Sequence, residues 1–309
     1  MSASRNAIVL PPPLGGWVDN FAADLFSPQE GPTFDFTSPA GEPALIPADS
    51  VSWRVFRNPV TLFIGGVTAV LLELAEPRVR DGVWQNSSFR TEPMGRLQRT
   101  GLAAMATVYG ARSRAEAMIA GVGRLHAQVA GRTSEGQAYR ADDPELLDWV
   151  QATASFGFLS AYSAYARRLS DAELDQAYAE GAVPARLYGA DGAPTSRAEI
   201  EALFDAMRGR LVPSPIVFEF LDIMRTVPAL PAPARPVQRL LLKAAVGILP
   251  LWVRHRLGLG ADWGLRGWER RLVRLLGGSG ERLLIRASPA VQACRRLGLP
   301  DDYLWTRSR

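Results

Sequence analysis

The chain has 309 residues, of which 47% are hydrophobic and 21% are charged, and its formal net charge is +4. This length and balance suit one large globular domain, or one domain with appendages, that buries a sizeable core. A single cysteine, Cys294, excludes an internal disulfide framework and a cysteine-based zinc site. The N-terminal residues lack the charged and long apolar segments of a secretory signal, so we expect a reducing, cytoplasmic setting.

Residues 1–56 are predicted to form an irregular arm. The first 50 residues contain eight prolines and four glycines, including three consecutive prolines at 11–13. These residues disfavour regular secondary structure. Trp17, Phe21 and Phe36 are unusual in a solvated linker, so we expect the arm to lie over the core.

Residues 57–230 are predicted to form a helical domain. Asn58 followed by Pro59 marks the start of a helix that reaches about Leu74. Its apolar stretch, residues 60–75, is shorter than the roughly 20 residues that span a bilayer, which favours a buried core helix. Further helices are predicted over about 78–85, from 91 to about 109, and after the Asp143-Pro144 pair.

Three more helix starts show capping-box spacing, in which a serine and a glutamate three residues later satisfy each other's backbone donors. These pairs are Ser113 with Glu116, Ser170 with Glu173, and Ser196 with Glu199. No segment shows the alternation that strands require. The sequence therefore predicts an all-α fold.

Residues 231–309 are predicted to form a basic helical extension that packs on the core. From Arg235 onward there are 15 Lys and Arg against 5 Asp and Glu, or +10, so the preceding residues carry −6. Such a surface, which includes Trp252, Trp263, Trp268 and Trp305, could contact an anionic membrane. The alternative is an ordinary solvated helical surface. No nucleic-acid partner is expected, because no recognised motif would place a helix in a groove.

His126 is the first candidate for a functional residue. Only two histidines occur in the chain, and His126 shares a predicted helix face with Ala115, Ile119 and Val122. An imidazole on an apolar face is either a hydrogen-bonded core histidine or a ligand to a bound group.

The preceding helix offers a second group of candidates. Arg96 and Thr100 are four residues apart and share a face with small residues, which leaves room for an anionic group or a ligand that carries one. The alternative is a surface arginine beside a threonine that bonds to its own helix. Glu73 and Glu76 are the nearest candidates for an acid/base pair, and Glu73 among leucines requires either a partner, such as Arg96, or exposure.

One inward histidine, an arginine and an apolar helical surface are compatible with haem b, which needs an axial imidazole and cations near its propionates. The pattern requires no cysteine motif. It indicates compatibility with haem rather than its presence.

The segment from about Leu62 to Glu180 resembles the MpaB and latex-clearing rubber oxygenase family. Four pieces carry the resemblance, in matching order and at similar spacing: GGVTAVLLELAEPRVRDGV, SSFRTEPMGRLQRT, GRLHAQVAG and YRADDPELLDWVQATASFGFLSAY. The tail piece ILPLWVRHRLGL resembles the C-terminal end of the family. The resemblance implies a globin-like helical haem domain, whose characterised relatives cleave isoprenoid double bonds with dioxygen.

The resemblance also implies roles for individual residues. His126 matches the axial haem ligand, which is the metal ligand, and Arg96 and Thr100 match an arginine and a threonine of the family. Arg99 stands where a rubber-cleaving relative has a lysine on the distal side. The family's acid/base glutamate has no certain match, and Glu73 and Glu76 remain the nearest candidates.

Two departures from the family are visible. Many members have histidine where this chain has Glu76, in AEP, and Gln151, in WVQ. If those histidines assist the reaction in relatives, this chain has lost or replaced them.

The main hypothesis is a haem b-dependent oxygenase that acts with dioxygen on an apolar, unsaturated, isoprenoid- or lipid-like substrate. A peroxidase-like haem protein is one alternative. The other is a non-catalytic helical protein that binds lipid or a membrane surface through its basic end, and peripheral membrane contact is compatible with the oxygenase as well.

Overall fold

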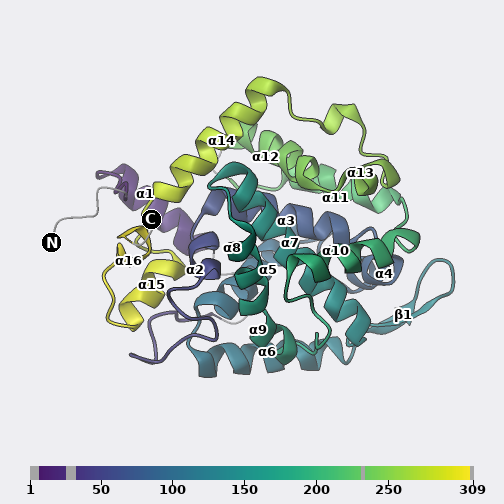
Figure 1. Cartoon of the computed structure of the whole chain (residues 1–309), viewed down its shortest axis with the longest axis horizontal. Coiled ribbons are helices and arrows are strands. Elements are labelled where there is room, and N and C mark those ends of the chain that lie inside the picture. Colours follow the sequence, from purple (N-terminus) through teal and green to yellow (C-terminus); the bar gives the residue numbers. More distant parts are fainter. Residues whose placement is uncertain (1–6, 26–32, 231–233, 307–309) are drawn as a thin grey trace.

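A computed structural model describes residues 7–25, 33–230 and 234–306 of the chain, and these residues are mainly helical (Figure 1). The prediction of an all-α fold is therefore confirmed. The helices of the first half are α1 (Leu14–Leu25), α2 (Val51–Val55), α3 (Pro59–Glu73), α4 (Pro77–Asn86), α5 (Pro93–Tyr109), α6 (Arg112–His126) and α7 (Pro144–Tyr165). Those that follow are α8 (Asp171–Glu180), α9 (Ala182–Leu187), α10 (Arg197–Ala206), η1 (Met207–Gly209) and α11 (Pro215–Thr226). The C-terminal helices are α12 (Arg235–Ile248), α13 (Leu251–Arg256), η3 (Ala261–Trp263), α14 (Gly267–Arg282), α15 (Pro289–Arg296) and α16 (Tyr303–Thr306).

The centre of the fold is the pair α3 and α7, which pack against each other along their lengths. Gly65 and Gly157 allow this close approach: a Cβ on Gly157 would come within 2.4 Å of the Gly65 carbonyl oxygen. α12 packs on α3, and α14 packs on both α3 and α7, so helices from the C-terminal part cover the central pair.

A second pair, α5 and α6, pack on each other, and α9 packs on α6. The Thr107 hydroxyl on α5 and the Tyr188 hydroxyl after α9 form a 3.1 Å hydrogen bond. Figure 1 shows α6 and α9 along one edge of the molecule, with α12, α13 and α14 along the opposite edge. The α5–α6 pair does not pack closely against α3 or α7.

Most of the predicted helix starts are confirmed. The Asn58 side chain accepts hydrogen bonds from the backbone N–H groups of Val60 and Thr61, at 3.1 and 3.2 Å. Asp143 caps α7, and Ser170 and Glu173 form a full capping box at α8. Ser196 caps α10, whereas the Glu199 carboxylate accepts the Thr195 N–H rather than completing the box. Capping residues act through neighbours in the sequence, which is why they could be predicted.

The predicted start at Ser113 is wrong. α6 begins at Arg112, and the Ser113 N–H and hydroxyl both donate to the Glu42 carboxylate, at 2.6 and 2.9 Å. A partner from the distant arm replaces the local capping box, and local spacing does not reveal such a partner.

Two further differences concern secondary structure outside the core. The predicted irregular arm contains α1, which begins just after the proline run, while residues 1–6 and 26–32 lie outside the described residues. β1 (Ala130–Arg132) and β2 (Ala138–Arg140) form an antiparallel hairpin that was not predicted, because strands of three residues carry too little alternation to be seen.

The described part of the arm lies against the C-terminal region, as expected. Ile8 N–H donates to the Arg282 carbonyl at 2.6 Å, and Leu284 N–H donates to the Ile8 carbonyl at 3.0 Å. The Asp19 carboxylate accepts the Ala287 N–H at 3.1 Å. The two ends of the chain are thus tied together.

Within the described ranges, no single helix has both the length and the apolar character to cross a membrane. α3 and α4 together would pass on length and composition, but a bend of 110° separates them. Most of α3 is buried in the core, in agreement with the prediction for residues 60–75.

Candidate functional site

His126 is the last residue of α6, on the side of that helix that carries buried Ala115 and Ile119. The ring is partly accessible, but its Nδ1 atom is buried and has no hydrogen-bond partner among the residues that the structure describes. Burial is the main cause that lowers the pKa of His126, the charge of Arg96 lowers it further, and Asp142 opposes both. The imidazole is therefore neutral at neutral pH, which is the form that binds a metal.

Glu73 is the last residue of α3. Surrounding protein atoms raise the pKa of its carboxyl group to about 7, while the charge of Arg96 and a hydrogen bond with the Thr153 side chain lower it. The side chain nevertheless remains partly accessible. Glu73 is therefore an enclosed carboxyl group that can exchange a proton near neutral pH.

Arg96, in the first half of α5, connects these two residues electrostatically. Burial lowers the pKa of Arg96, Glu73 raises it, and Arg99 lowers it. The Arg96 guanidinium also donates to the Thr100 hydroxyl, one turn later in the same helix. Glu73 on α3 and His126 on α6 thus both lie within electrostatic range of Arg96 on α5, and we call these three residues with Thr100 the His126 site.

The helices around the His126 site keep partly accessible faces. On α3, Gly66, Val70 and Glu73 recur every three or four residues and therefore share one side. On α5, partly or fully accessible residues recur in the same way at Arg96, Thr100, Ala103 and Thr107. The site thus adjoins surfaces of small and apolar residues.

Two cavities in the described part of the molecule lie elsewhere. One of about 290 Å³ is at the ends of α7 and α12. The other, of about 400 Å³, is lined by residues 48–50, Arg54 and residues of the C-terminal end. Neither is lined by a residue of the His126 site.

Glu76, the second acid/base candidate, is occupied by structural contacts. It is 2% exposed and caps α4, where its carboxylate accepts the Val79 N–H at 2.9 Å. It also accepts from Arg78 Nε at 2.9 Å, and Arg210 lies 3.9 Å away. These contacts hold the corner between α3 and α4.

Arg99 and Gln151 point to other partners. Arg99 donates to the Ser88 hydroxyl at 2.6 Å and pairs with Glu92 at 3.3 Å, although it is close enough to Arg96 to affect its pKa. Gln151 donates to the Ser155 hydroxyl at 3.4 Å on its own helix.

Two residues near the site were not predicted. Thr153 reaches Glu73 from α7, and Asp142, in the segment between the hairpin and α7, influences His126. A hydroxyl within the small-residue run ATASFG is a weak sequence signal for Thr153. Asp142 has no local signal, since the hairpin that places it was itself not predicted.

Comparison with known proteins gives one family. The chain matches the family described as ER-bound oxygenase mpaB/B'/Rubber oxygenase, catalytic domain, over residues 53–278. This match covers α3, α5, α6 and α7, and it also covers the described C-terminal helices from α12 through most of α14. No curated protein and no solved structure matches the chain. Because the match spans well over half of the chain and includes every residue of the His126 site, the protein belongs to the mpaB and rubber oxygenase family and carries its oxygenase catalytic domain.

Proposed function

We propose that the protein is a haem b-dependent oxygenase that uses dioxygen to oxidise an apolar, unsaturated substrate of isoprenoid or lipid type. The observation that carries this proposal is the His126 site: a neutral imidazole with an unpartnered, buried Nδ1, placed near an enclosed arginine and an enclosed carboxyl group. Membership of the mpaB and rubber oxygenase family supports the assignment as an oxygenase. The chemistry of these residues supports haem, and the substrate class is proposed from the resemblance to the family and from the apolar residues beside the site.

The residues fit a haem. His126 would hold the iron, since its neutral imidazole has a buried ring nitrogen, Nδ1, that no described residue satisfies. Arg96, held by Thr100, would pair with a propionate. When bound, haem b supplies an iron that can bind and activate dioxygen.

Glu73 is the residue of the chain best suited to move a proton in this reaction. Its pKa of about 7 lets it both accept and release a proton near neutral pH. The charge of Arg96 limits the rise of the Glu73 pKa. Arg99 is the second cation on this part of α5. To stabilise negative charge on the reacting oxygen, its guanidinium would have to break its contacts with Ser88 and Glu92.

Oxygen uptake by haem-supplemented protein tests the proposal, with squalene as an apolar isoprenoid probe. We expect dioxygen consumption with cleavage of the probe, and a fall of 10²-fold or more in kcat for Glu73→Gln at neutral pH. Glu145→Gln, at an exposed carboxylate, is the matched control and should retain kcat.

Peroxide-dependent dye oxidation is measured in parallel. Dye oxidation without dioxygen uptake would favour the peroxidase alternative and overturn the oxygenase assignment. Equal activity in Glu73→Gln and Glu145→Gln would show that Glu73 has no role in proton transfer.

A further inference from the structure

A second site lies far from the His126 site, at the edge formed by α12, α13 and α14 (Figure 1). The cavity of about 290 Å³ opens where α7 and α12 end. Its lining consists of Ala164, Tyr165, Gly247, Ile248, Arg254, Gly264, Leu265, Arg270 and Arg274. We call it the arginine cavity, because three guanidinium groups from α13 and α14 surround it.

The three arginines have no acidic partner in the described part of the chain. Arg254 is half-buried and Arg270 and Arg274 are exposed, and none of the three forms an ion pair there. Several buried or half-buried cations elsewhere do form ion pairs. Arg254 Nη2 donates only to the Gly260 carbonyl at 3.4 Å, and its Nε is buried without a partner. These donors are therefore available to a ligand.

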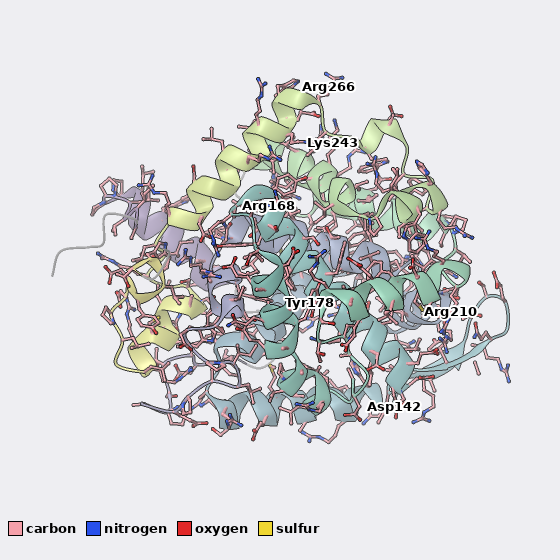
Figure 2. All side chains as sticks on the ribbon, in the orientation of Figure 1. Asp142, Arg168, Tyr178, Arg210, Lys243 and Arg266 are labelled. Atoms are coloured by element: carbon pink, nitrogen blue, oxygen red, sulfur yellow. The ribbon has the colours of Figure 1, made fainter. Side chains whose placement is uncertain are left out.

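The nearby acids do not neutralise this charge. Glu269, on α14, accepts from Lys243 Nζ at 2.9 Å and from the Arg266 N–H at 2.6 Å. Asp262, on η3, is exposed and makes no ion pair with a described residue. Figure 2 shows Lys243 and Arg266 on this same edge of the molecule.

The two helix ends at the cavity offset only part of the charge. A helix C-terminus carries about −0.5 elementary charge, so α7 and α12 together contribute roughly −1 against three positive charges. The remaining surplus of about +2 exceeds the single negative charge of a phospholipid phosphodiester, so the cavity attracts an anionic headgroup. Arginine is also the side chain best suited to bind phosphate, because its planar donors pair with two oxygens.

Exposed apolar side chains lie on the two helices that carry these arginines. Leu251 is 63% exposed and stands three residues before Arg254 on α13, hence on the same side of that helix. Trp268 and Leu275, 60% and 65% exposed, lie two turns apart on α14, on a different side of that helix from Arg270 and Arg274. Residues 235–282 hold ten Lys or Arg against three acids.

The exposed apolar side chains and the excess of positive charge favour a lipid headgroup over a free phosphate ion as the ligand. A free phosphate ion would gain nothing from exposed leucine and tryptophan side chains on the same helices. A bilayer that contains anionic lipid interacts with the apolar side chains and with the arginines, since apolar side chains enter the headgroup region and cations bind lipid phosphates.

We propose that the arginine cavity binds the phosphate of an anionic phospholipid, so that Leu251, Trp268 and Leu275 rest in the membrane surface and the protein docks peripherally on the bilayer. This docking is independent of haem and of the proposed oxygenase reaction. It would hold an enzyme for water-insoluble substrates at the phase in which they dissolve.

Vesicle flotation of the full chain tests the proposal, with phosphatidylcholine vesicles compared with vesicles that also contain phosphatidylserine. We expect binding to require phosphatidylserine and to weaken as salt rises. Removing two cavity charges in Arg270→Gln/Arg274→Gln should weaken binding about 30-fold. The matched control Arg112→Gln/Arg186→Gln removes two exposed charges from α6 and α9, on the opposite edge, and should change binding less than twofold.

Trp268→Ser/Leu275→Ser keeps every charge and tests the apolar part. It should also weaken vesicle binding, while circular dichroism shows an unchanged fold. Equal binding by the cavity variant and its control, or binding that is indifferent to phosphatidylserine, would overturn the proposal. Binding of inorganic phosphate that depends on Arg270 and Arg274, without any vesicle binding, would overturn the lipid assignment.

Discussion

The Glu73 carboxyl group on α3 and the Arg96 guanidinium on α5 interact electrostatically across two helices that do not otherwise pack closely. Each partly compensates the burial of the other. Arg96 in turn lowers the pKa of His126. The protonation states of the three groups are therefore coupled: the histidine is neutral, and the glutamate is poised near neutral pH.

The raised pKa of Glu73 makes stability depend on pH. Burial raises this pKa from 4.5 to about 7. Between these two pH values, Glu73 is protonated in the folded protein and ionised in the unfolded chain. The contribution of Glu73 is fully present below pH 4.5 and is lost as pH rises towards 7. Without added haem, the free energy of unfolding should fall by about 2 to 3 kcal/mol between pH 5 and pH 8 relative to Glu73→Gln.

Urea unfolding of both proteins at the two pH values measures this difference. Parallel pH profiles for the original protein and Glu73→Gln would show that the Glu73 pKa is close to its ordinary value in the folded protein.

The close contact between α3 and α7 predicts a second effect. In Gly157→Ala the new Cβ would come within 2.4 Å of the Gly65 carbonyl oxygen and 3.2 Å of the Ala69 nitrogen. The backbone cannot yield easily there, so we expect a loss of about 2 kcal/mol or more. In Gly66→Ala, the matched control, the nearest atom is 3.9 Å away, and alanine should stabilise the helix by about 0.5 to 1 kcal/mol. Thermal unfolding distinguishes the two, and equal melting temperatures would contradict the close contact.

Two of the acids that pair with Arg78, Glu76 and Glu145, should differ in their effect on stability. Glu76 is buried and caps α4, whereas the Glu145 side chain is 56% exposed. Glu76→Ala removes a cap and leaves part of Arg78 buried without its neighbour, so we expect a loss of about 3 kcal/mol. Glu145→Ala should cost less than about 1 kcal/mol. If Glu76→Ala instead folds with unchanged stability and loses activity, its role is catalytic rather than structural.

The sequence predicts the fold better than it predicts the arrangement of the site. The starts at Asn58, Asp143 and Ser170 depend on neighbours within three residues, and the structure confirms them. The start at Ser113 was wrong because Glu42, some 70 residues earlier, takes both of its donors. Local spacing describes local partners only.

The candidate site shows the same limit. Helical spacing places His126 on the side of the buried Ala115 and Ile119. The cost of burying a carboxylate among leucines leads to Arg96 as one candidate partner of Glu73, and its charge does act on that group. The contributions of Thr153 and Asp142 depend on how α7 and the hairpin pack, which no local pattern contains. The sequence offers both Glu73 and Glu76 as acid/base candidates, and the structure separates them because Glu76 caps α4 and pairs with Arg78.

The absorption spectrum of haem-supplemented protein, oxidised and reduced, tests the central claim most directly when His126→Ala is compared with His255→Ala. His255, the other histidine of the chain, is exposed on α13 and serves as the matched control. We predict a Soret band of stoichiometric intensity in the original protein and in His255→Ala, and its loss or shift in His126→Ala. A fully loaded His126→Ala protein with an unchanged spectrum, or the absence of any band in the original protein, would contradict the account.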